Sequence, residues 1–181
     1  MLLVVLSSYP SKRMRKTNAV HNLGTTGRYS EAMERIKQPG DYVLVLRGIP
    51  RAIVLSCPDG CGEHVVINLD KDGGPAWRRY TTGGKLSLYP SVWRDSGCRA
   101  HFILVRDRVL WCGADDSGAP ISVDQSLIAA VLECLNRVTP THYESIATSL
   151  SAIPWEIAWA CATLKRSGLA SEPKRGYFLS H

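Results

Sequence analysis

The chain has no long apolar segment. Among its 181 residues, the uninterrupted apolar stretch at the N-terminus runs only from Met1 to Leu6. A membrane helix needs about 20 apolar residues, and a secretory signal needs a basic start followed by a longer apolar region. Because neither pattern is present, residues 2–6 fit a buried strand better. We therefore expect a cytoplasmic protein that does not bind a membrane.

Repeats, low-complexity segments and a strong excess of charge are also lacking. Hydrophobic residues make up 45% of the chain and charged residues 21%, which is usual for a soluble globular protein. The net charge of +6 is uneven, since Lys and Arg outnumber Asp and Glu by 17 to 10 in residues 1–115 but not in residues 116–181, with 5 against 6. Much of this basic excess lies in Lys12–Lys16. It would suit an acidic partner such as nucleic acid, but a positively charged surface exposed to water explains it better.

Short apolar runs dominate the first two-thirds of the chain. A helix is predicted over Arg28–Lys37, with Ser30 as its N-cap. Five runs that follow are rich in Val, Ile and Leu and are separated by Gly, Pro or Asp, which predicts strands. They are Tyr42–Arg47, Ala52–Ser56, His64–Leu69, His101–Val105 and Val109–Cys112. The polar residues Arg106–Arg108 predict a hairpin between the last two.

The pattern changes after residues 113–119, whose composition is that of a linker. From 123 to 136, apolar residues recur at helical spacing. Pro140 and Pro154 each predict the start of a further helix, because proline suits the first helical position. The third helix is predicted to stop at Gly168, and two short strands follow.

Three helices followed by a hairpin are typical of a winged helix. We therefore predict an α+β fold with two domains. Residues 1–115 form a small, mostly antiparallel β-domain, and residues 120–181 form a winged-helix-like domain.

Six cysteines are present, and a cytosolic compartment would keep them reduced, so we do not expect a disulfide framework. Cys57 and Cys61 lie on a glycine-rich turn, where two thiolates can bind one zinc ion. A tetrahedral site needs two more ligands. We favour Cys98 and Cys112, and the pair Cys98 and His101 is the alternative. A closed four-ligand zinc would stabilise the fold without activating water.

The remaining cysteines, Cys134 and Cys161, fall on the apolar faces of their predicted helices. Free cysteine often acts as a small buried hydrophobe, and we expect that role for both.

Between the metal-ligand candidates lies a segment with a serine, a histidine and two arginines. A serine nucleophile needs a base to take its proton and donors to hold the developing oxyanion. Ser91 and His101 could form such a pair, with Arg94 as an orienting or charge-stabilising group. The plainer interpretation makes Ser91 a turn residue and His101 a ligand or a packed strand residue. No hydrolase signature such as GxSxG is present.

A third catalytic group is not selected by spacing. Glu63, Asp70 and Asp95 all remain possible.

Several motifs together resemble a known bacterial family. The motifs are Arg47-Gly-Ile-Pro-Arg51, then CPDGCGEHVVINL from Cys57, then PSVWRDSGCRAHF from Pro90, and finally Val109-Leu-Trp-Cys112. In this order they are similar to a zinc-binding family known as domain of unknown function 6527. The resemblance covers roughly residues 40–113.

Members of that family are often encoded beside ubiquitin-like proteins and their activating-like and conjugating-like enzymes, in antiphage operons of the Bub type. The resemblance implies a peptidase that processes the ubiquitin-like protein or removes it from targets. It also implies metal binding by Cys57, Cys61, Cys98 and Cys112, and a reactive pair of Ser91 and His101.

The predicted winged helix does not have the charge pattern of a DNA reader. Its third helix begins Pro154-Trp155-Glu156, and its cations Lys165 and Arg166 come at the far end. We expect protein contact rather than DNA contact, although Lys174 and Arg175 in the wing keep nucleic acid as an alternative. Two functions follow: a zinc-stabilised serine peptidase, or a non-catalytic adaptor that binds protein or nucleic acid.

Overall fold

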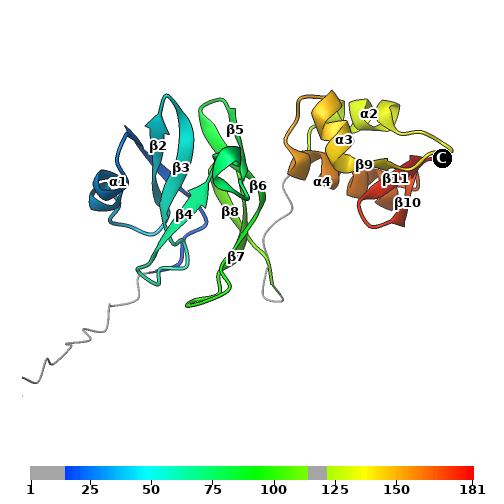
Figure 1. The fold of residues 1–181 in the computed structure, drawn as a ribbon. Helices are drawn as coiled ribbons and strands as arrows, with labels where there is room; N and C mark the ends of the chain where they lie inside the picture. Colours follow the sequence, from blue (N-terminus) through cyan, green and yellow to red (C-terminus); the bar gives the residue numbers. More distant parts are fainter. Residues whose placement is uncertain (1–14, 114–121) are drawn as a thin grey trace, which may run out of the picture. The chain divides into compact units, whose positions relative to one another are not determined.

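The computed structural model describes residues 15–113 and 122–181 (Figure 1). The chain divides into two compact units, Met1–Asp116 and Ser117–His181. The strand predicted at residues 2–6, the start of the basic Lys12–Lys16 cluster and most of the predicted linker at 113–119 lie outside the described residues. None of the described helices is long and apolar enough to cross a membrane.

The first sheet of this unit is buried on both faces at its two central strands. Its strands are β1 (His21–Thr26), β2 (Asp41–Arg47), β3 (Ile49–Ser56) and β4 (His64–Asn68), in that order, with helix α1 (Tyr29–Arg35) between β1 and β2. β1 runs parallel to β2, and the other neighbours are antiparallel. Successive side chains of a strand point to opposite faces. Val43 and Val54 therefore pack against Ala32 of α1 on one face, while Ile53 and Leu55 join the main core on the other.

The second sheet of this unit faces the first across the main core. It contains β5 (Arg78–Thr82), β6 (Lys85–Trp93), β7 (His101–Val105) and β8 (Arg108–Trp111), all antiparallel, and a short 3-10 turn, η1 (Lys71–Gly73), precedes it. Figure 1 shows the two sheets side by side, with α1 on the outer face of the first. Leu88, Phe102 and Leu104 are buried with the apolar residues of β3, so both sheets share one core.

The turn between β7 and β8 confirms the predicted hairpin. Arg106 and Asp107 both have positive φ, 49° and 62°, as a two-residue turn matched to strand twist requires. The Asp107 carboxylate accepts a hydrogen bond from the Leu86 amide at 2.8 Å, which ties the turn to the start of β6.

The first unit differs from the sequence prediction in three strands and one helix cap. β1, β5 and β6 were not predicted, and Ser91, predicted on a turn, lies in β6. Pro90 made β6 hard to predict, because proline has no N–H to donate to the hydrogen bonds of a sheet. In the structure Pro90 lies between Leu88 and Val92, where the register of β6 with β7 shifts. At α1, Ser30 lies inside the helix, and the cap residue is Arg28.

The second unit contains three helices and a three-stranded antiparallel sheet. The elements are α2 (Gln125–Cys134), β9 (Thr141–His142), α3 (Tyr143–Ser149), α4 (Pro154–Arg166), β10 (Ala170–Lys174) and β11 (Tyr177–Ser180), with sheet order β10-β11-β9. Val131, Ile146 and Ile157, one from each helix, meet in its core. The helix predicted to open at Pro140 begins three residues later, because residues 141–142 pair with β11. The fold is thus α+β with mostly antiparallel sheets, as predicted.

Candidate metal centre and serine–histidine pair

The cysteine-rich turn after β3 is held by its own backbone. The Cys57 amide donates to the Glu63 carbonyl at 2.9 Å, and the Gly60 amide donates to the Cys57 carbonyl at 3.1 Å. Gly60 and Gly62 have φ values of 78° and 84°, a region that side-chain-bearing residues rarely adopt. The glycines therefore allow the chain to fold back tightly, so that the turn carries both Cys57 and Cys61.

The loop between β6 and β7 brings a third cysteine to this turn. The loop closes through hydrogen bonds from the Arg94 amide to the Ala100 carbonyl, 2.9 Å, and from the Arg99 amide to the Ser96 carbonyl, 3.3 Å. Gly97 has a φ of 63°, and a β-carbon there would lie 2.9 Å from a Glu63 carboxylate oxygen. The positive φ favours glycine at this position, and the absence of a side chain leaves room for the Glu63 carboxylate.

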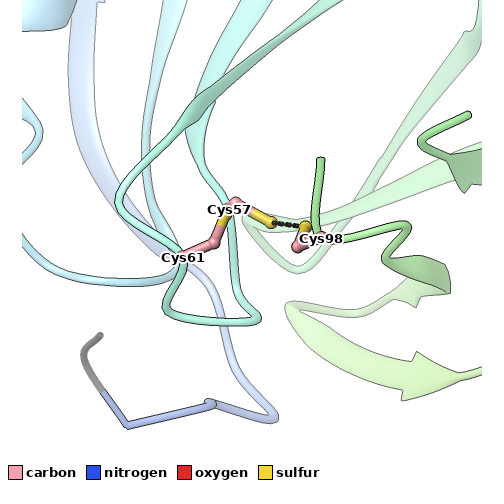
Figure 2. A group of neighbouring side chains, drawn as sticks. All are labelled: Cys57, Cys61 and Cys98. Carbon is pink, nitrogen blue, oxygen red and sulfur yellow. Dashed lines mark hydrogen bonds between the residues drawn. The ribbon is translucent and has the colours of Figure 1, made fainter. Parts of the chain in front are cut away.

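Cys57, Cys61 and Cys98 form a cluster of three sulfurs. Their Sγ atoms all lie within 4.8 Å of one another, and the distance from Cys57 Sγ to Cys98 Sγ is 3.6 Å (Figure 2). Four thiolates bound tetrahedrally at about 2.3 Å from zinc would have their sulfurs about 3.8 Å apart. The spacing and the thiolate chemistry of the cluster both fit a soft divalent ion.

Cys112 is not part of this three-sulfur cluster. It follows β8 directly, it is half-buried, and its amide donates to the His101 carbonyl at 2.9 Å. This places Cys112 across the ladder from His101, the other residue considered as a fourth ligand.

Arg94, predicted as an orienting or charge-stabilising group, lies against the sulfurs. Its guanidinium donates to Cys61 Sγ at 3.4 Å and to Cys98 Sγ at 3.2 Å, and it forms an ion pair with Glu63. Burial opposes the charge, but the hydrogen bonds to Glu63 and Cys57 outweigh it and raise the pKa of Arg94. A fixed positive charge therefore faces the group of thiols and favours their ionised form.

The thiols of the cluster ionise differently. Burial raises the pKa of Cys57 to about 12. Burial also opposes ionisation of Cys61, but a hydrogen bond from the backbone at Glu63 and the neighbouring Cys98 lower its pKa overall. In the metal-free protein Cys57 therefore keeps its proton at neutral pH, and a bound metal must displace that proton.

Ser91 and His101 lie together on the second sheet. The Ser91 hydroxyl oxygen is 3.1 Å from His101 Nε2, a hydrogen-bonding distance. β6 and β7 are neighbours, and the shifted register pairs Trp93 rather than Ser91 directly with His101. The shift places the serine diagonally from the imidazole, within its reach.

Two tryptophans flank this pair. The Trp77 indole N–H donates to the Ser91 carbonyl at 3.3 Å, which holds the backbone that carries the hydroxyl. The Trp93 ring packs beside the His101 ring, with centroids 5.8 Å apart. Sequence analysis missed both residues. Had residues 85–93 been predicted as a strand, its alternation would have placed Trp93 on the same face as Ser91.

The three carboxylates considered as a third catalytic group have other surroundings. Glu63 pairs with Arg94, and Asp70 pairs with Arg51. Asp95 is exposed in the loop after β6. These positions do not single out an acidic partner for His101.

The two helical cysteines have apolar surroundings. Cys161 in α4 is fully buried in the second core, and burial raises the pKa of its thiol to about 12. Cys134 in α2 is half-buried against the same core. Neither residue belongs to a metal-ligand cluster in the part of the chain that the structure describes.

Fold and site together define a two-sheet β-domain whose β6–β7 segment contributes both to a sulfur cluster and to a serine–histidine pair. Residues 29–112 match the sequence model of BubE, a family described as a bacterial ubiquitination-like system serine protease. The match confirms the family resemblance predicted from the motifs, and it runs from α1 to Cys112. By that description the family consists of proteases, and therefore hydrolases, of a ubiquitination-like system. No curated protein and no solved structure matches the chain.

Proposed function

We propose that this chain is a serine peptidase that processes a bacterial ubiquitin-like protein or removes it from conjugates, within an antiphage conjugation system. The observation that carries the proposal is the 3.1 Å contact between the Ser91 hydroxyl and His101 Nε2. The family match supports the same assignment, because the matched segment contains both residues. The expected partners are the ubiquitin-like protein and its conjugation enzymes.

The reaction would proceed by acyl transfer. Ser91 Oγ attacks the carbonyl carbon of the scissile amide while His101 Nε2 accepts the hydroxyl proton. The tetrahedral oxyanion collapses, the carbon–nitrogen bond breaks, and His101 gives its proton to the leaving amine. Water then attacks the acyl-serine with His101 as base, which releases a carboxylate and restores the serine.

We assign the metal a structural role, with zinc held by Cys57, Cys61, Cys98 and Cys112. A zinc ion with four thiolates supplies a rigid crosslink and has no open position for water. Cys98 lies three residues before His101, and Arg94, which contacts the sulfurs, lies three residues after Ser91. The crosslink would therefore fix the loop that joins the two strands carrying the reactive pair.

We propose that the second unit is a winged helix that contacts protein. Trp155 and Trp159 are half-buried on α4, whereas Lys165 near its end is paired with Glu172. A helix that reads DNA would present cations or amides near its start. Protein contact therefore suits this unit better than a phosphate backbone.

Substitution of the reactive pair tests the proposal. Ser91→Ala and His101→Ala should each reduce cleavage of a C-terminally extended ubiquitin-like protein by at least about a thousandfold, as expected for loss of a nucleophile or its base. Metal content and thermal unfolding should be unchanged. Ser96→Ala in the adjoining loop and His64→Ala in β4 are matched controls, because both side chains are exposed. A fluorophosphonate probe should label the wild type but not the Ser91→Ala variant.

Two results would contradict this assignment. If Ser91→Ala still cleaves the substrate, Ser91 is not the nucleophile. If His101→Ala releases the metal, His101 is a metal ligand. If the protein binds the ubiquitin-like protein or duplex DNA in a salt-dependent way but cleaves nothing, the adaptor function replaces the peptidase.

A further inference from the structure

Trp93 is an exposed aromatic residue at the end of a mostly buried strand. Its exposed fraction is 71%, and among the large hydrophobic residues of the described part of the chain only Val138, at 84%, is more exposed. Leu86 and Leu88 in the same strand are almost fully buried. A single exposed apolar residue is common on protein surfaces, so the exposure of Trp93 becomes informative through its contact with the His101 ring.

Two other tryptophans of the first unit, Trp77 and Trp111, have structural roles that differ from the position of Trp93. Trp77 and Trp111 both pack against the main core, and each donates its indole N–H to a protein oxygen: the Ser91 carbonyl at 3.3 Å and Asn18 Oδ1 at 2.8 Å. Trp93 does not belong to that core cluster. The contact that defines its position is with the ring of His101, at 5.8 Å between centroids and a tilt of 34°.

His101 therefore lies next to two side chains of β6: its Nε2 is 3.1 Å from the Ser91 hydroxyl, and its ring packs beside the Trp93 indole. In the proposed reaction His101 donates its proton to the nitrogen of the departing amine. The departing group must then lie beside the imidazole when the bond breaks. The indole that packs against this imidazole is exposed on the same side of the strand.

We infer that Trp93 is a substrate-contact residue that binds the amine side of the scissile bond. This inference rests on the proposed function. The ligand is a peptide segment, or the aliphatic stem of a lysine side chain in a conjugate, lying against the indole face. Both are flat or apolar and can pack on an aromatic ring, and a nearby lysine ammonium would add cation–π attraction. Trp93 thus selects what is attached to the ubiquitin-like protein, and the acyl side is bound elsewhere.

Two substrates that differ only in their leaving group test this assignment. One is the ubiquitin-like protein extended by a peptide, and the other is the same protein ending in a primary amide, whose leaving group is ammonia. Trp93→Ala should raise KM for the peptide-extended substrate at least about tenfold and leave kcat within about twofold, as for loss of an aromatic contact. KM for the primary amide should change less than about twofold. Trp93→Phe should restore most of the affinity.

Val66→Ala is the matched control, because Val66 is an exposed residue of the other sheet, 48% accessible, and should alter neither substrate. Equal KM effects of Trp93→Ala on both substrates would overturn the assignment to the amine side, and no effect on either would remove Trp93 from the binding site. A kcat loss without a KM change would make Trp93 a positioning residue for His101. In all these cases Ser91→Ala remains inactive if the proposed function holds, so the two failures are distinguishable.

Binding can also be measured without turnover. In the Ser91→Ala background, the peptide-extended protein should quench tryptophan fluorescence, and the added change Trp93→Phe should remove that part of the signal. Should the quenching persist at full strength after Trp93→Phe, the peptide does not contact the indole.

Discussion

Cysteine has opposite roles in the two units of this chain. In the first unit Cys57, Cys61 and Cys98 lie on glycine-rich turns, face one another within 4.8 Å and receive hydrogen bonds from Arg94. In the second unit Cys161 is fully buried on the apolar face of a helix. The same side chain is a metal-ligand candidate where irregular backbone brings several together, and a small hydrophobe where a helix spaces them apart.

Charge divides the units in the same way. The basic excess lies in the first unit, where the Arg94 guanidinium faces the thiols, and the second unit is close to neutral. The sulfur cluster and the proposed reactive pair both lie in the first unit, within the segment that matches the protease family. The second unit is expected to contribute stability and binding, so changes in one unit should leave the other intact.

Loss of the metal should have the largest effect. We expect Cys57→Ser, or treatment with a strong chelator, to destabilise the first unit by about 4–5 kcal/mol or more, because the proposed metal crosslink between the turn and the loop would be lost. Metal content, measured by atomic emission, should fall to zero, and the first unfolding transition should shift or vanish. The transition of the second unit should stay in place. If the metal-free protein unfolded like the wild type, the cysteines of the first unit would have no stabilising role as metal ligands.

A cavity in the second core should have the next largest effect. Ile157 is fully buried in α4, so Ile157→Ala should reduce the free energy of unfolding of the second unit by about 2–5 kcal/mol. Denaturant melts followed by circular dichroism would measure it. Metal content and cleavage of a simple substrate should match the wild type. A variant that lost metal would show that the two units are coupled.

Cys161→Ser should cost less. The substitution places a hydroxyl in the apolar core around Cys161, where the expected loss of stability is about 1–3 kcal/mol. Cys134→Ser, at a half-buried site of the same core, should cost less still. If either change releases metal, the helical cysteines are not merely buried hydrophobes.

The smallest predicted effect depends on pH. Hydrogen bonds from Lys165 and from the Gly176 amide lower the pKa of Glu172 below 4.5. A lowered folded-state pKa means that the stabilisation is present above the unfolded value and is lost as pH falls through the folded one. Glu172→Gln should therefore lower stability at pH 7 by about 0.2–1 kcal/mol, with a smaller difference near pH 3. If the stability difference between the wild type and Glu172→Gln grew as the pH fell, the lowered pKa of Glu172 would not be its cause.

The regular parts of the chain were predictable because their signals are local. The β7–β8 hairpin and the helix α4 that opens at Pro154 follow from turn residues and from proline at the first helical position. The start of α3 was predicted at Pro140 but lies at Tyr143, because Thr141 and His142 pair with β11 instead of joining the helix. β6 was missed because its proline lies in a register shift that only the neighbouring strand defines.

The composition and spacing of the sequence were enough to indicate an α+β chain and a cysteine-rich turn, and the family resemblance pointed to Ser91 and His101. Spacing along the chain could not decide between His101 as a metal ligand and His101 as a partner of serine. The 3.1 Å contact between Ser91 and His101 depends on the register of β6 against β7, and the contact of Arg94 with the sulfurs depends on the loop between these strands. The reason is physical: which side chains meet across a sheet depends on pairing between strands, and a shift of one residue sends a side chain to the opposite face.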